Sequence, residues 1–212
     1  AVARSTIRIE IPFMIGVTAL LFYQGRDGSI SLADGGVLMV AFAVYMMYLY
    51  TMAMKSNVDS DLEEPGLPLG RCLLGAVGGL ALIIAGSNVT VGAATSIATY
   101  AGLSERFIGL TIVALGTSLP ELFTSVAAAR RGNADIAIGN IVGSNIFNIL
   151  FVVGLSSLII DIPFASAFNF DTYVALGAAV LLWLCVLRTQ RLQRWAGALM
   201  LVCYAAYLGY IL

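Results

Sequence analysis

The sequence predicts an all-α polytopic membrane protein with about seven transmembrane helices, and three observations lead to this fold class. Hydrophobic residues make up 60% of the 212 residues and charged residues only 11%, a balance that soluble domains of this size do not normally have. Apolar runs of about the length needed to cross a bilayer recur between short polar turns. Lysine and arginine gather in alternate turns, as the positive-inside rule describes.

Two apolar runs occupy residues 1–54. The first, residues 11–24, is short for a span of about 20 residues, so we expect it to cross as a tilted or partly covered helix. The second, residues 35–54, ends in the aromatic sequence YMMYLY, which is typical of the headgroup level of a membrane. Residues 55–68 carry four acidic residues and two prolines, and this composition predicts an aqueous linker on the cytoplasmic side.

Residues 69–212 are expected to contain the other five spans. The first of them, residues 70–102, is expected to be one long helix or a helix broken at the sequence GSN, residues 86–88. The glycine pairs Gly75/Gly79 and Gly139/Gly143 have the four-residue spacing that lets helix backbones approach closely. The four remaining spans are expected at residues 106–130, 136–160, 170–187 and 195–212.

The distribution of basic residues predicts the orientation. With seven spans, nine lysines and arginines fall on one side of the membrane and two, Arg26 and Arg106, on the other. The positive-inside rule then places the beginning of the chain in the cytoplasm and Leu212 outside, in an inner or plasma membrane. A net charge of −1 does not indicate a nucleic-acid partner. The absence of histidine and the wide spacing of the three cysteines argue against a zinc-type metal site.

One carboxylate, Glu121, lies deep inside an expected span, 15 residues from Arg106 and 9 from Arg130. An ionisable residue at such a depth is a functional-site hypothesis, because burying it in lipid is costly. Pro120 precedes it, lacks an N–H and clashes with the carbonyl one turn earlier, so we expect the helix to kink or unwind across residues 114–118. Carbonyls freed in a membrane need a partner, and a cation supplies one. Thr117 shares the helix face of Glu121.

The next span carries a polar stripe of Asn140, Ser144 and Asn148, each one turn apart. A short turn joins the two spans, so they are expected to be antiparallel neighbours with these polar groups facing each other. Carboxylate, hydroxyl and carbonyl oxygens are the ligands of hard cations such as Ca²⁺ and Na⁺. Alternatives are a tolerated proline kink, asparagines that join helices, and a glutamate that relays protons or serves as a structural hydrogen-bonding group. The coincidence of all these groups on two consecutive helices favours a cation site.

Two motifs resemble a known family. The sequences GTSLPELFTS, residues 116–125, and GNIVGSNIFNIL, residues 139–150, are similar to the second alpha-repeat of the sodium/calcium exchanger family in the calcium/cation antiporter superfamily. RIEIPF, residues 8–13, resembles the start of the fourth helix of that family. The resemblance implies the later part of a fold of ten helices in two inverted repeats, with cation sites at the midplane. Residues 1–54 would end the first half, and residues 69–212 would form the second, with its alpha-repeat at 112–150.

The resemblance also implies a set of ion ligands. Glu121 would be the carboxylate shared by Ca²⁺ and Na⁺, and Asn148, where some relatives have aspartate, would make the site less negative. The full implied set is Glu121, Thr117, Ser118, the carbonyl of Ala114, Ser144 and Asn148. No second copy of the motif occurs in the chain, so we expect the chain to supply half of the site. It is then expected to be a fragment, the product of a split gene or a half that pairs with a second chain.

The expected function is therefore exchange of Ca²⁺ for Na⁺ by alternating access, with no cofactor and no enzymatic reaction, since no pair of nucleophile and base occurs. The expected partners are the two ions, the lipid bilayer and the first-repeat segment or a second chain. The nearest alternative is exchange of H⁺ for Ca²⁺, which the form GTSLPE and the absence of histidine disfavour. A non-transporting membrane assembly subunit is the alternative from a different class.

Overall fold

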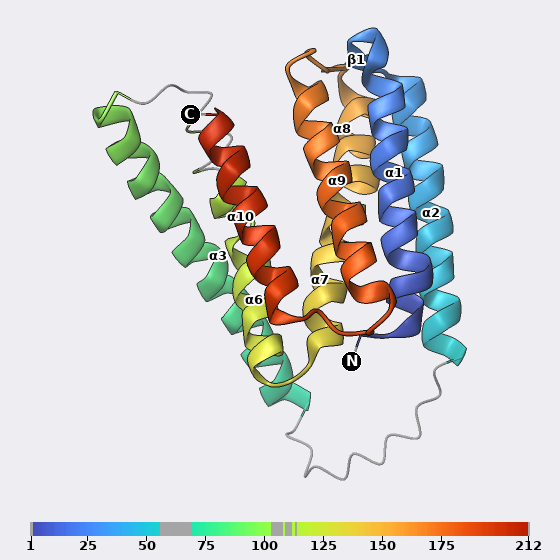
Figure 1. Cartoon of the computed structure of the whole chain (residues 1–212), viewed down its shortest axis with the longest axis vertical. Helices are drawn as coiled ribbons and strands as arrows, with labels where there is room; N and C mark the ends of the chain where they lie inside the picture. The colour runs from blue at the N-terminus through green and yellow to red at the C-terminus, as the bar shows by residue number, and fades with distance from the viewer. Residues whose placement is uncertain (1, 56–68, 103–107, 109–111, 113, 212) are drawn as a thin grey trace.

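The chain folds into helices that run broadly along one axis, with the two termini at opposite ends (Figure 1). A computed structural model describes residues 2–55, 69–102, 108, 112 and 114–211. The elements in chain order are η1 Thr6–Glu10, α1 Ile11–Gln24, η2 Gly25–Asp27, β1 Ser29–Ile30, α2 Leu32–Lys55, α3 Leu69–Tyr100, α5 Ala114–Thr117, α6 Leu119–Arg130, α7 Ala134–Phe147, η4 Asn148–Val153, α8 Gly154–Ile159, β2 Ile162–Pro163, α9 Phe168–Leu187 and α10 Arg194–Ile211.

The predicted fold class, an all-α polytopic membrane protein, is confirmed. Among the described residues, five helical segments are long and apolar enough to cross a membrane: Thr6–Asp27, Leu32–Met54, Gly70–Tyr100, Ala134–Ile159 and Phe168–Leu187. The span expected at residues 106–130 lies partly outside the described residues, and its described part contains α5 and α6. The span expected at residues 195–212 corresponds to α10, an 18-residue helix. The linker expected at residues 55–68 lies outside the described residues except for Lys55.

The first expected span differs in length from the sequence-based prediction. It is longer than the apolar run, because the π-helical turn η1 precedes α1 and the 3-10 turn η2 follows it, which brings the span to 22 residues. Pro12 is the second residue of α1, directly after the π-helical turn η1, and the helical segment continues through it. For the third span, α3, the structure selects one of the two expected alternatives, a long helix that is unbroken across residues 86–88. The Thr90 hydroxyl donates to the Gly86 carbonyl within this helix, at 2.8 Å.

The core of the bundle explains how α7 is oriented. Val142, Ile146 and Leu150 follow one another at four-residue spacing along α7 and η4, and all three are fully buried. They pack in one apolar cluster with residues of α1 and α2, including Ile11 and Leu38, which are also fully buried. A position two residues further along a helix lies on nearly the opposite face. The polar stripe of α7 therefore points away from α1 and α2.

The close helix approaches are not where the glycine spacing predicts them. An added Cβ at Gly139, Gly143, Gly75 or Gly79 would meet no atom of the described residues within 4 Å, so the prediction of tight packing there is wrong for this part of the chain. Instead, α2 and α8 meet at Gly35, where an added Cβ would overlap Ser157 Oγ. Four-residue spacing occurs on any helix face and does not identify the face that meets a neighbour.

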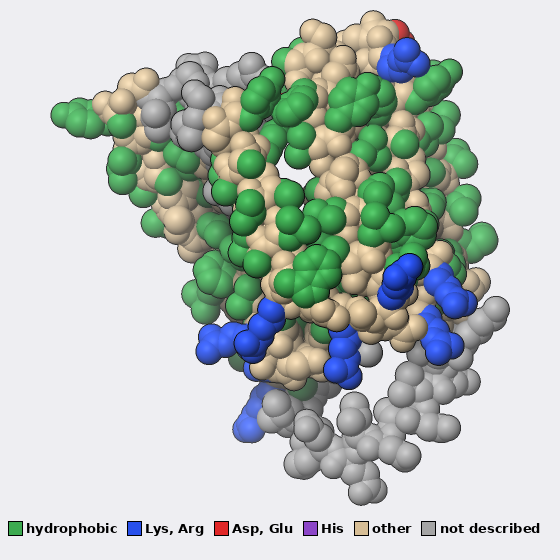
Figure 2. All heavy atoms as spheres, viewed as in Figure 1, with side chains coloured by type: hydrophobic (Ala, Val, Ile, Leu, Met, Phe, Trp, Pro, Cys, Tyr) green, Lys and Arg blue, Asp and Glu red, His purple; other side chains and the backbone are tan. Residues whose placement is uncertain are grey.

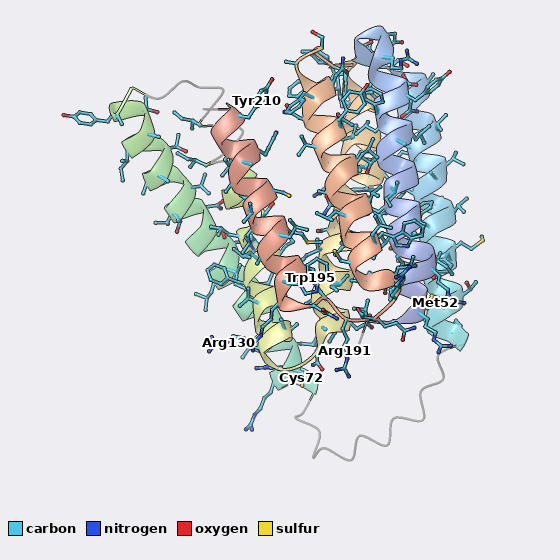
Figure 3. All side chains as sticks on the ribbon, viewed as in Figure 1. Met52, Cys72, Arg130, Arg191, Trp195 and Tyr210 are labelled. Atoms are coloured by element: carbon cyan, nitrogen blue, oxygen red, sulfur yellow. The ribbon has the colours of Figure 1, made fainter. Side chains whose placement is uncertain are left out.

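Basic side chains gather at one end of the molecule. Figure 2 shows most of the lysine and arginine side chains at the lower end, and Arg130 and Arg191 are labelled there in Figure 3, on the side where the chain begins. Arg26 belongs to η2, next to the two-stranded antiparallel pair β1–β2 at the opposite end. The charge asymmetry expected from the sequence is therefore present along the bundle axis.

Candidate cation site

Glu121 is placed by a break between two helices. Helix α5 ends at Thr117, Ser118 adopts φ −93° and ψ 1°, and α6 begins at Leu119 with proline in its first turn. The sequence predicts a kink or unwinding across residues 114–118; the structure has a break within this range, at Ser118, and keeps residues 114–117 helical. A proline in the first turn of a helix loses no hydrogen bond, so a single non-helical residue before it is sufficient.

This break also gives Glu121 a favourable electrostatic position. The carboxylate belongs to the first turn of α6, where the helix dipole stabilises negative charge. The Ser118 carbonyl already accepts the Leu122 N–H at 2.9 Å, so the first turn of α6 is regular. Glu121 is only partly exposed. The fold therefore holds a partly exposed acidic side chain at the start of a helix that packs against α3 and α7.

Helices α6 and α7 are neighbours, as the short connection between them predicts. Gly132 in this connection has φ +81°, a left-handed conformation that glycine adopts without steric cost. The chain reverses within residues 131–133. The polar stripe of α7 then faces the side of α6 that carries Glu121.

A cavity of about 460 Å³ lies between these two polar faces. Its lining side chains are Thr117, Ser118, Glu121, Leu122, Ser125, Ile141, Ser144, Asn145 and Asn148. Five of the six proposed ligand residues are thus brought together from α5, α6, α7 and η4. The sixth, Ala114, is not among the lining residues, and only its backbone is described.

The carboxylate of Glu121 has an unsatisfied oxygen. Its Oε2 atom is buried and has no hydrogen-bond partner within the described part of the chain. A buried polar atom without a partner costs about 1–3 kcal/mol, and more when it is charged. No group of three or more histidine, cysteine or acidic residues that could hold a metal occurs among the described residues, so Glu121 is surrounded in its cavity by neutral polar groups. The arrangement suits a hard cation that completes its shell elsewhere.

The neutral polar side chains differ in how they are arranged to bind a cation in the cavity. The Ser144 hydroxyl donates its hydrogen to the Ile141 carbonyl at 3.1 Å, which leaves oxygen lone pairs for another partner. Asn148 is the first residue of the π-helical segment η4, and such segments are frequent at functional sites. Asn140, the first member of the predicted stripe, does not line the cavity.

Two polar lining residues were missed by the sequence reasoning. Ser125 stands one turn after Glu121, so its spacing could have placed it on the same face; its hydroxyl donates to the Ala137 carbonyl at 3.2 Å. Asn145 stands next to Ser144, and its amide donates to the Ile141 carbonyl at 2.8 Å. Ser125 lies on α6, and Asn145 lies one residue after Ser144 on α7. Neither therefore belongs to the four-residue stripe of α7, and that stripe did not identify them.

A sequence comparison finds a match for most of the chain. Residues 72–212 match the sequence model of the family described as "Sodium/calcium exchanger protein". The "Putative antiporter CaxA" of Alkalimonas amylolytica is 36% identical over 98% of this chain and 68% of the relative. The "Sodium/calcium exchanger MaX1" of Methanosarcina acetivorans is 37% identical over 60% of this chain and 37% of the relative.

Solved structures agree with the sequence matches. The sodium-calcium exchanger NCX_Mj, soaked with Na⁺ and Sr²⁺, superposes with a TM-score of 0.78 at 30% identity. That superposition covers 98% of this chain and 67% of the exchanger. A second structure, of the sodium/calcium exchanger from Methanococcus jannaschii, gives a TM-score of 0.73 at 29% identity and covers 99% of this chain and 66% of that one. The chain therefore spans about two thirds of these exchangers.

Proposed function

The chain belongs to the sodium/calcium exchanger family, and from that premise we propose that it takes part in the exchange of Ca²⁺ for Na⁺ across a membrane. The single observation that carries the proposal is the buried Oε2 atom of Glu121, which has no hydrogen-bond partner among the described residues and lies in a cavity lined with hydroxyls and amides. The proposed ligands are the side chains of Glu121, Thr117, Ser118, Ser144 and Asn148, together with the carbonyl of Ala114.

The proposed mechanism is competition for one set of oxygen atoms. Ca²⁺ and Na⁺ are both hard cations that bind carboxylate, hydroxyl and carbonyl oxygens. If both need Glu121, the site must release one ion before it takes the other. Exchange then follows when helix movements open this cavity alternately to the two sides of the membrane.

The ligand count supports a half-site. Ca²⁺ takes six to eight oxygen ligands, and one carboxylate leaves one positive charge of a bound Ca²⁺ unbalanced. We propose that a segment bearing a first repeat, or a second chain, supplies further ligands opposite this cavity. The proposal agrees with the share of the relatives that this chain spans.

The distribution of arginines supports an orientation. We propose that the basic end of the bundle, which carries Arg130 and Arg191, faces the cytoplasm and that the C-terminal end of α10 faces outward. The protein would then be a multi-pass protein of an inner or plasma membrane. Cysteine labelling from either side of right-side-out vesicles tests this, and labelling of position 131 from outside would contradict it.

The test of the proposed function is sodium-gradient-driven uptake of radioactive calcium into proteoliposomes containing the protein. With the segment or second chain that completes the site present, we expect Glu121→Gln to reduce uptake by about 100-fold or more, because removing one partner of a desolvated charge pair costs about 3–5 kcal/mol. Asp161→Asn is the matched control, since it removes an exposed carboxylate outside the cavity. Normal uptake in Glu121→Gln would refute the proposal.

The same vesicles separate the alternatives. Uptake driven by a pH gradient and not by a sodium gradient would indicate exchange of H⁺ for Ca²⁺. An assembly subunit without transport activity predicts that Glu121→Gln lowers the yield of the assembled protein and leaves the ion flux per molecule unchanged. Repeating the measurement with this chain alone tests the half-site: uptake would mean that the chain builds a complete site, most simply by pairing two copies.

A further inference from the structure

Asn140 connects α7 to the turn of α6 that carries Glu121. Its side-chain nitrogen Nδ2 lies 3.2 Å from the backbone carbonyl oxygen of Glu121, 3.0 Å from Thr124 Oγ1 and 3.0 Å from Ser125 Oγ. These three acceptors belong to consecutive turns of one neighbouring helix. Asn140 itself is not among the side chains that line the cavity.

We propose that Asn140 is a positioning residue that fixes the Glu121 carboxylate in the cavity and thereby sets the affinity and selectivity of the ion site. The inference rests on the proposed function, because it assigns a role toward the same carboxylate. It separates the polar stripe of α7 into two parts. Asn140 acts through α6, whereas Ser144 and Asn148 face the cavity.

The hydrogen-bond chemistry supports this role and argues against a ligand role. An amide nitrogen only donates, so Nδ2 would repel a cation. The two Nδ2 hydrogens are shared among three acceptor oxygens of α6. The hydroxyls of Thr124 and Ser125 are themselves committed as donors: Thr124 to the carbonyls of Pro120 and Glu121, at 2.9 and 3.1 Å, and Ser125 to the Ala137 carbonyl.

The hydrogen bonds of Asn140 include one to the backbone of the residue that carries the carboxylate. Fixing the Glu121 backbone fixes the start of its side chain, which then has only three rotatable bonds to reach the cavity. An ion site that discriminates between cations of different size needs its ligands held closely in place. Among the hydrogen bonds between the described residues of α6 and α7, the one from Asn140 Nδ2 to the Glu121 carbonyl reaches the Glu121 residue itself.

The experiment measures calcium transport kinetics in proteoliposomes, normalised to the amount of folded protein. We expect Asn140→Ala to raise the KM for Ca²⁺ by about fivefold to tenfold, as the loss of intramembrane hydrogen bonds implies. Asn140→Asp keeps the shape and, when ionised, replaces the donor by an acceptor, so it should raise KM at least as much. The ratio of Sr²⁺ to Ca²⁺ transport should change in both variants. Thr172→Val is the control, because among the described residues its hydroxyl bonds only within α9, to the Phe168 carbonyl.

Each outcome has a defined meaning. A wild-type KM and a wild-type ratio of Sr²⁺ to Ca²⁺ in Asn140→Asp would overturn the inference, because a role in filling space survives that change. If Asn140→Ala does not fold, Thr124→Val removes one of the three acceptors, and an unchanged KM there would also overturn it. The proposed function fails separately, if Glu121→Gln transports normally. Loss of transport in Glu121→Gln together with a wild-type KM in both asparagine variants would overturn only the role of Asn140.

Discussion

The contact between α2 and α8 gives a prediction about stability with an internal control. At Gly35, an added Cβ would overlap Ser157 Oγ and lie 2.8 Å from the Gly154 carbonyl oxygen. At the adjacent Gly36, an added Cβ would meet no described atom within 4 Å. Both glycines belong to α2. Replacing each by alanine therefore changes the same helix in the same way except for this one contact.

The expected change in the free energy of unfolding is the sum of two opposing contributions. Alanine in a helix is more favourable than glycine by about 1 kcal/mol, and this gain applies to both variants. Overfilling a packed contact costs about 1–3 kcal/mol, and this cost applies only to Gly35→Ala. The two variants should thus differ by about 1–3 kcal/mol, which corresponds to about 2–12 °C in melting temperature for a chain of this size.

The assay is thermal unfolding of the purified protein in detergent, followed by the loss of the monodisperse peak in size-exclusion chromatography. We expect Gly36→Ala to melt at or above the wild-type temperature and Gly35→Ala to melt below Gly36→Ala. Adding Ser157→Ala to Gly35→Ala should recover part of the loss, since it removes the overlapping hydroxyl. Equal melting temperatures for the two glycine variants would refute the packing argument.

Two further predictions concern the cavity and the last helix. Asn148→Asp adds a second carboxylate to the cavity, so the KM for Ca²⁺ in proteoliposomes should fall by about threefold or more; an unchanged KM would place Asn148 away from the ion. Tyr207→Phe removes the hydrogen bond of 2.9 Å from the Tyr207 hydroxyl to Asp171, whose Oδ2 is already buried with no hydrogen-bond partner in the described part of the chain. The cost of about 1–3 kcal/mol should lower the melting temperature by several degrees relative to the exposed control Tyr210→Phe, and equal melting would indicate that the Asp171 carboxyl is hydrated.

Much of the fold could be predicted because membrane helices are specified by composition. Apolar length places helices without any knowledge of their partners, and the alternation of arginines places their ends. The position of Glu121 indicated a functional site, because a charged residue deep inside an expected span is costly to keep there. Thr117 and Ser118 followed from their distance along the chain to Glu121.

The rest depends on contacts that sequence spacing does not contain. Nothing in the sequence separates Gly35, which touches α8, from Gly36, which does not. Similarly, Asn140 and Ser144 have the same spacing along α7, but only Ser144 lines the cavity. The π-helical turn η1 was missed because Arg8 and Glu10 interrupt the apolar run at the end of the span, where charged side chains still reach water. Packing decides where a helix ends and which helices are its neighbours, and a local sequence pattern does not contain this information.

The core and the candidate site are two faces of the same helix. Val142 and Ile146 bury one face of α7 against α1 and α2, and a helix cannot rotate one face without moving the other. The direction of Ser144 toward α6 is thus fixed by apolar packing on the far side of α7. On the α6 side, Glu121 has no comparable set of fully buried neighbours among the described residues of its own helix, since of these only Ser125 and Ala128 are buried. The polar network of Asn140 is then what couples the well-packed helix to the carboxylate, which is why a single amide is expected to change KM.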